Sequence, residues 1–280
     1  MADVHGYLVR IGVRDPGPPS VEGLFALHRA QVGRVAYENL DIQLGRTLSI
    51  DPASSFGRIV AGRGGYCFHL NGAFSLLLAQ LGYAVRWRRG GVQGREEPAP
   101  VGATGNHLAL TVHDLPSADN PEGVWFVDAG LGDALYEPLP LRAGEHHNGS
   151  FRFTLAPSEV EPGGWRFGHD PTVGSFTGMD FRSEVADVTD FQPTHEWLSS
   201  APESGFVKLA VVQRRDATGA DVLRGRLLSR APNGQPRELA SAAEWYAALG
   251  DLFGLSVPTE DRARLWRRVT LAHGAWLASR

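Results

Sequence analysis

Residues 63–71 read Arg-Gly-Gly-Tyr-Cys-Phe-His-Leu-Asn and contain Cys67, the only cysteine of the 280-residue chain. A glycine pair precedes this cysteine and an apolar run to Leu81 follows it, which predicts a tight turn into a helix. A thiol in the first turn of a helix meets unpaired backbone N–H groups and the positive end of the helix dipole, and both favour the thiolate. The pattern therefore predicts a nucleophile, although a lone cysteine is often only a small buried side chain.

A nucleophilic cysteine needs a base within hydrogen-bond reach and a third group that orients the base. His107 opens the alternating apolar run 107–113, which predicts a strand emerging from a loop rich in Gly, Pro and charge. A second predicted strand, 124–127, leads directly into Asp128. The turn between them contains Pro, Asp, Asn and Gly, so we expect an antiparallel hairpin with His107 and Asp128 at the same end. His113 lies at the other end, and we therefore prefer His107 as the base.

Composition and charge agree with a soluble enzyme and exclude little else. A net charge of -4 and an isoelectric point near 6.2 give no general attraction to nucleic acid or to anionic membranes. One cysteine cannot form an internal disulfide, which suits a reducing compartment. The first twenty residues contain charges and three prolines where a signal peptide would have an apolar core. We expect a cytoplasmic protein with no membrane or nucleic-acid partner.

Helical signals dominate the first 85 residues, where Ser20 is placed to cap a helix over 21–35 and residues 70–81 form a second apolar stripe. Short segments rich in branched and aromatic residues then predict strands. The predicted strands are residues 83–88, 107–113, 124–127, 151–155, 165–167, 176–181, 206–214 and 222–228. Helices return over 241–253, with Ser241 and Glu244 as a capping box, and over 260–277. The adjacent pair His146 and His147 has no second ligand group after it, so we expect no metal site.

With these motifs in place, the chain resembles the arylamine N-acetyltransferases. Residues 63–71 resemble the nucleophile segment of that family, and Asn106-His107 resembles its histidine strand. The stretch Val-Asp-Ala-Gly-Leu-Gly at 127–132 is similar to its aspartate and glycine loop, and residues 36–45 are similar to its Glu-Asn-Leu helix end. Four motifs in the family's order are a specific signal, and together they cover about residues 20–135.

The resemblance implies an α+β fold of three domains with a triad arranged as in cysteine proteases. Residues 1–85 would form a helical bundle that carries the nucleophile. Residues 86–204 would form an antiparallel β-barrel that carries the histidine and the aspartate, and residues 205–280 a mixed α/β lid. A cleft between the first two domains is then expected to hold the site.

The same resemblance implies an acetyl-CoA-dependent transfer of an acetyl group to an arylamine, hydrazine or arylhydroxylamine nitrogen, with acetyl-CoA as co-substrate. The triad would be Cys67, His107 and Asp128. Gly130 and Gly132 leave the N–H groups of their loop open to the pyrophosphate of CoA, without the pattern of a nucleotide P-loop. Val92 and Leu131 are expected at the acceptor. Glu38 and Arg63 would form either a buried ion pair that supports the nucleophile turn or a surface pair. The oligomeric state is not determined by the sequence, and a homodimer is one of the alternatives.

Two residues depart from the family's pattern. His69 stands where the family usually has a carboxylate, and we expect it on the helix surface, directed away from the thiol. Leu131 stands where many members carry an aromatic residue, which affects the choice of acceptor. Three other functions stay open: an amide synthase that releases a carrier-bound polyketide chain, a cysteine hydrolase or transglutaminase, and a non-catalytic ligand-binding paralogue.

Overall fold

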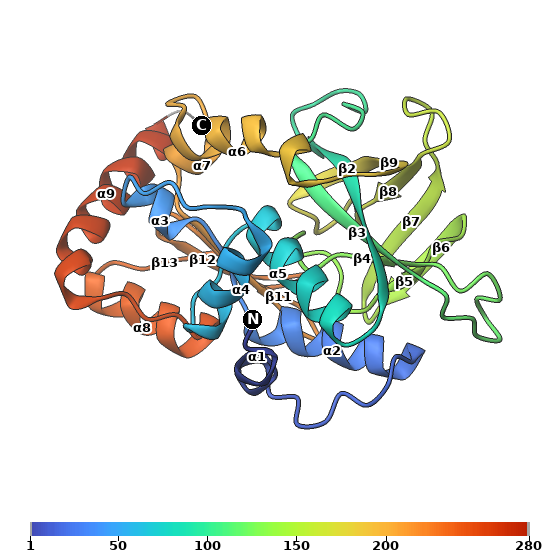
Figure 1. Ribbon diagram of the computed structural model, residues 1–280. Helices are drawn as coiled ribbons and strands as arrows, with labels where there is room; N and C mark the ends of the chain where they lie inside the picture. The colour runs from blue at the N-terminus through green and yellow to red at the C-terminus, as the bar shows by residue number, and fades with distance from the viewer. Residues whose placement is uncertain (1, 279–280) are drawn as a thin grey trace.

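The computed structural model describes residues 2–278, and Figure 1 shows a helical part, a curled sheet beside it and a smaller sheet flanked by the C-terminal helices. The helical part comes first in the chain. Its helices are α1 (Val4–Ile11), α2 (Val21–Arg34), α3 (Leu40–Gln43), α4 (Pro52–Val60) and α5 (Cys67–Gln80). The Ser20 hydroxyl accepts from the N–H of Gly23 at 3.0 Å, which confirms the predicted cap of α2.

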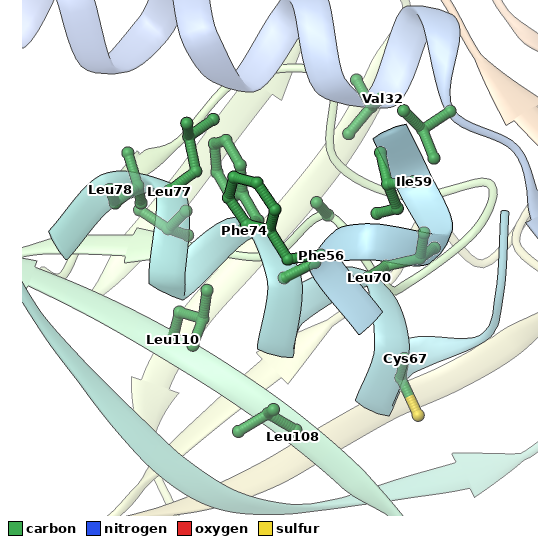
Figure 2. Close-up of a cluster of buried hydrophobic side chains, with 14 of the residues drawn as sticks. Val32, Phe56, Ile59, Cys67, Leu70, Phe74, Leu77, Leu78, Leu108 and Leu110 are labelled. Atoms are coloured by element: carbon green, nitrogen blue, oxygen red, sulfur yellow. The ribbon is translucent and has the colours of Figure 1, made fainter. Parts of the chain in front are cut away.

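Helix α5 is the centre of the helical part because apolar residues surround its axis on all sides. Figure 2 shows Phe74 and Leu77 of α5 among side chains from α2, α4 and the strand that contains Leu108 and Leu110. The sulfur of Cys67 lies at the end of this cluster and is directed away from the labelled apolar side chains. Packing along α5 therefore fixes the position of the thiol.

The larger sheet has eight strands, all paired antiparallel, in the order β5-β4-β3-β2-β9-β8-β7-β6. It curls into a nearly closed barrel (Figure 1). The strands are β2 (Ala84–Gly94), β3 (His107–His113), β4 (Trp125–Val127), β5 (Leu139–Pro140), β6 (Gly144–Asn148), β7 (Phe151–Pro157), β8 (Trp165–Gly168) and β9 (Phe176–Val185). Leu110 of β3 faces Val127 of β4, which confirms the predicted hairpin and places the start of β3 near the end of β4.

The smaller sheet joins the two ends of the chain. Its order is β1-β10-β11-β12-β13, all antiparallel. The strands are β1 (Tyr37–Glu38), β10 (Val211–Arg215), β11 (Ala220–Arg224), β12 (Leu227–Ala231) and β13 (Arg237–Glu238). Helices α8 (Ala242–Phe253) and α9 (Thr259–Ala278) follow, and Trp245 of α8 is fully buried in the core beside this sheet. Because β1 comes from the first part of the chain, the smaller sheet ties the helical part to the C-terminal part.

Short helices connect the two sheets: η1 (Val188–Asp190), α6 (Gln192–Ser200) and α7 (Gly205–Lys208). This connection packs against the helical part, where the rings of Phe191 and Phe68 lie 5.4 Å apart. None of the helices within residues 2–278 is both long and apolar enough to span a membrane.

Two strand predictions were wrong in detail. The segment 206–214 begins as α7, which the Ser204 hydroxyl caps, and only its second half is β10. The segment 222–228 is the end of β11, a turn and the start of β12, because Gly225 at φ 59° reverses the chain. The capping box of Ser241 and Glu244 on α8 is confirmed.

Candidate active site

Cys67 is the first residue of α5, and the extended backbone of Tyr66, at φ -99° and ψ -172°, leads into the helix. The glycine pair before it is required by close packing. A Cβ on Gly64 would lie 2.1 Å from the carbonyl oxygen of Ala36, and a Cβ on Gly65 would lie 2.6 Å from the Cβ of His69. The thiol is therefore set at a helix N-terminus by a turn that only glycine fits.

His107 and Asp128 form the pair that the sequence predicted. Nε2 of His107 donates to Oδ2 of Asp128 at 2.7 Å, and both side chains are buried. The thiol of Cys67 lines the same cavity as the His107 ring, and its Sγ lies 3.7 Å from the carbonyl oxygen of Asn106, the residue before His107. Burial by itself would lower the pKa of His107, but Asp128 and the sulfur of Cys67 outweigh it and raise this pKa to about 10. An imidazolium that faces the thiol stabilises a thiolate.

Asn71 is the residue of the site that sequence reasoning missed. Its amide nitrogen donates to Oδ1 of Asp128 at 2.7 Å and to the carbonyl of Leu108 at 2.6 Å, and its oxygen accepts from the N–H of Ala129 at 2.8 Å. Asn71 lies four residues after Cys67, so both project from one face of α5. This four-residue spacing from Cys67, within residues 63–71, is the sequence signal that points to Asn71.

The glycine loop after Asp128 fits closely around the nucleophile. The N–H of Gly130 donates to Oδ1 of Asp128 at 2.9 Å, and a Cβ on Gly130 would lie 2.7 Å from the Cα of Cys67. The expectation that this N–H meets the pyrophosphate of CoA is therefore corrected, because the triad carboxylate already occupies it. Gly132, at φ 63°, leaves room for the side chain of Gln213.

A cavity of about 280 Å³ opens in front of the thiol, between the helical part, the barrel and the smaller sheet. Its lining includes both predicted acceptor-binding residues, Val92 and Leu131. The other lining residues are Tyr37, Cys67, Gly94, Asn106, His107, Gly130, Ser175, Phe176, Leu198, Phe206 and Gln213. Within residues 2–278, no three His, Cys, Asp or Glu side chains come together as they would around a metal ion.

Glu38 is buried, but Arg63 is not its main partner. Arg58 reaches Oε1 of Glu38 at 2.6 Å, whereas Arg63 lies 3.7 Å from the same oxygen and 3.0 Å from Asp41. The predicted pair is thus part of a network in which Arg58 and Arg63 contact both Glu38 and Asp41, and Arg46 also contacts Asp41. Nε of Arg58 also donates to the carbonyl of Gly64, so the network holds the turn that precedes the nucleophile.

His69 is not on the surface. Only 2% of the residue is exposed, and its ring lies edge-on to that of Tyr66 at 4.7 Å. Neither ring nitrogen has a hydrogen-bond partner among the described residues. The prediction was wrong because α5 is buried on every face, so the position two residues after the nucleophile also faces protein.

A thiol, an imidazole and a carboxylate in this geometry are typical of enzymes that carry a covalent intermediate on cysteine. The family model for N-acetyltransferases matches residues 20–262. The chain therefore belongs to the N-acetyltransferase family and is an acetyltransferase.

Relatives and solved structures agree with this assignment. The arylamine N-acetyltransferase of Escherichia coli is 28% identical over 260 residues, which are 90% of this chain and 88% of that protein. The arylamine N-acetyltransferase / N-hydroxyarylamine O-acetyltransferase of Salmonella typhimurium is 35% identical over 142 residues, about half of each chain. The structure of the Mycobacterium marinum arylamine N-acetyltransferase in complex with CoA superposes with a TM-score of 0.81, at 27% identity, and covers 95% of this chain and 98% of that one.

Proposed function

We propose that this protein moves an acetyl group from acetyl-CoA, through a thioester on Cys67, to the nitrogen of an arylamine or a hydrazine. One observation carries the proposal: the thiol at the start of α5, the His107 ring and the buried carboxylate of Asp128 meet at one cavity. The relatives named above are arylamine N-acetyltransferases, and one of them is solved with CoA. Gly132 remains a candidate contact for CoA.

In the first half-reaction the Cys67 thiolate attacks the thioester carbonyl of acetyl-CoA. The backbone N–H of Cys67, unpaired at the helix N-terminus, is placed to stabilise the oxyanion. The bond to the CoA sulfur breaks, and the His107 imidazolium gives its proton to that sulfur. Asp128 keeps the ring in one orientation throughout, as its 2.7 Å hydrogen bond requires.

In the second half-reaction the acceptor nitrogen attacks the acetyl-cysteine. His107, now neutral, takes the proton of the attacking nitrogen as general base. The Cys67 sulfur leaves as a thiolate beside the new imidazolium, so the starting charge state is restored. The apolar part of the cavity, with Val92, Leu131 and Phe176, would hold the aromatic ring of the acceptor.

The test is the mass of the intact protein after mixing with acetyl-CoA alone. A gain of one acetyl group is expected in the native chain and not in Cys67→Ala, and an arylamine or a hydrazide should remove it much faster than water does. His107→Gln should slow acetylation about 10²–10⁴-fold. His113→Gln is the matched control on the same strand, and an equal loss there would contradict the assignment of the base.

Other outcomes separate the remaining functions. No adduct with acetyl-CoA, but one with a carrier-bound acyl thioester, would indicate an amide synthase. Rapid discharge by water would indicate a hydrolase, and no adduct with any thioester a ligand-binding paralogue. We further propose that the enzyme works in the cytoplasm on small molecules, without nucleic-acid or membrane partners, as a monomer or a homodimer.

A further inference from the structure

Four polar side chains outside the triad line the cavity in the described part of the chain, and two of them, Tyr37 and Gln213, lie on the smaller sheet. Tyr37 lies on β1 and Gln213 on β10, and the two residues face each other in the antiparallel register. Directly opposed residues of neighbouring strands project from the same face of a sheet, with their Cβ atoms about 5 Å apart. Tyr37 and Gln213 therefore form one polar patch on the wall that the smaller sheet contributes to the cavity.

The other polar side chains of the cavity are already hydrogen-bonded within the protein. Asn106 accepts from the N–H of Val92 at 2.7 Å and donates to the carbonyl of Val92 at 3.2 Å. The hydroxyl of Ser175 donates to Asp133 at 2.8 Å. By contrast, no hydrogen bond within residues 2–278 involves the hydroxyl of Tyr37 or the side-chain amide of Gln213.

Gln213 is held in place rather than free to turn toward solvent. Only 5% of the residue is exposed, and a Cβ on Gly132 would lie 2.0 Å from its Oε1. Gly132 adopts φ 63°, a conformation that suits glycine, and its missing side chain gives the amide its room. The amide opens onto the cavity, where a bound molecule can donate to it or accept from it.

Tyr37 is a neutral donor and acceptor. Burial raises the pKa of its hydroxyl well above the ordinary value, and the nearby charge of Cys67 raises it further. The hydroxyl therefore keeps its proton and can both donate and accept a hydrogen bond. Asp133 acts on it in the same direction as Cys67. The positive charge of Arg224 acts in the opposite direction, so charges of both signs lie near the patch.

The rest of the cavity wall is apolar and suits an aromatic ring. Its apolar side chains are those of Val92, Leu131, Phe176, Leu198 and Phe206. The ring of Phe206 lies 6.4 Å from the ring of Tyr37 at an angle of 77°, so the polar patch borders the apolar wall directly. A ring held by the apolar wall would bring one of its substituents to the patch.

We infer that Tyr37 and Gln213 select, as acceptors, aromatic amines whose ring carries a neutral group that both donates and accepts hydrogen bonds, such as a hydroxyl. This inference rests on the proposed function and specifies its acceptor. An alkyl group in place of the hydroxyl would leave the two polar side chains without partners, and loss of such partners is a strong source of discrimination. Acetyl-CoA and acceptor use the cavity in turn, so the patch is open to the acceptor after CoA has left.

The test compares 4-aminophenol with 4-methylaniline, which differ by a hydroxyl and a methyl group of similar size. Dissociation constants are measured by NMR titration on Cys67→Ala, so that the result does not depend on turnover. We expect this protein to bind 4-aminophenol about 10-fold more tightly. Adding Tyr37→Phe or Gln213→Leu should reduce that preference about 5- to 10-fold, since each removes one hydrogen bond. Tyr246→Phe removes a hydroxyl from distant α8 and should leave the preference unchanged.

A preference near unity in Cys67→Ala, or an unchanged preference in both cavity variants, would overturn the inference. Tyr37→Phe or Gln213→Leu made in the native chain would also overturn it by raising the KM for acetyl-CoA while leaving the preference between the two amines unchanged, because the patch would then serve the donor. Failure of the proposed function has a different signature, namely no acetyl adduct on native Cys67. The binding comparison on Cys67→Ala would still decide the inference in that case.

Discussion

Acid should weaken the folded state through His69, the buried histidine behind the nucleophile. Burial, the charge of Arg58 and the neighbouring His195 lower the pKa of His69 to about 3, against the opposing effect of Asp41. In the unfolded chain a histidine titrates near pH 6.5. Below that pH the unfolded state binds a proton that folded His69 does not bind. The free energy of unfolding therefore falls as the pH is lowered from about 6.5 toward 3.

The size of the effect follows from the two pKa values. At pH 8 the side chain is neutral in both states and contributes nothing to the pH dependence. At pH 5 the unfolded histidine is protonated and the folded one is not. The free energy of unfolding is therefore lower by about 2 kcal/mol, since it falls by about 1.36 kcal/mol for each pH unit below 6.5. Replacing His69 with glutamine removes the titrating group and should remove this loss.

Urea denaturation at pH 8 and pH 5, followed by tryptophan fluorescence, measures the effect. The native chain should lose about 2 kcal/mol more than His69→Gln between the two pH values. His28 and His195 also have lowered pKa values through burial, but they are common to both proteins and cancel in the comparison. His147→Gln, at an exposed position of β6, should behave like the native chain. Equal losses in the native chain and His69→Gln would refute the reasoning.

Three further changes probe the site and its support. Asn71→Ala should lower kcat about 10- to 100-fold, because the triad carboxylate loses its amide donor; an unchanged kcat would show that the donor is dispensable. Gly130→Ala places a Cβ 2.7 Å from the backbone of the nucleophile and should slow its acetylation, measured by intact mass, whereas Gly57→Ala on α4 has open space and should not. Glu38→Gln removes one of the two carboxylates that Arg58 contacts, while Asp41 at 2.7 Å stays, and should lower the free energy of unfolding by about 1–3 kcal/mol in urea denaturation; no measurable change would make the pair equivalent to a surface one.

The sequence by itself determined the parts that depend on short-range rules. The glycine pair and the apolar run predicted that Cys67 begins a helix, and alternation predicted the hairpin that carries His107 and Asp128. The caps at Ser20 and Ser241 followed from residues three positions apart. Helix starts, caps and hairpins can be predicted from sequence because capping hydrogen bonds and side-chain periodicity act over a few residues.

Contacts between distant segments required the tertiary structure. The sequence indicated that Glu38 has an arginine partner but did not identify it as Arg58. Arg58 and Arg63 are close together in the chain, and only the packing of the turn around Gly64 decides which of them reaches Glu38. The prediction also placed His69 on the surface, although the apolar residues on every side of α5 are a signal of a buried helix.

The polar patch of Tyr37 and Gln213 depends most completely on the tertiary structure. It arises only because β1, from the first part of the chain, pairs with β10 from the last. No local pattern links two residues so far apart in the chain. Their pairing depends on the packing of the whole C-terminal part against the helical part, which is a property of the assembled core. The sequence alone predicted the reacting groups, and the tertiary structure alone decided which side chains face them across the cavity.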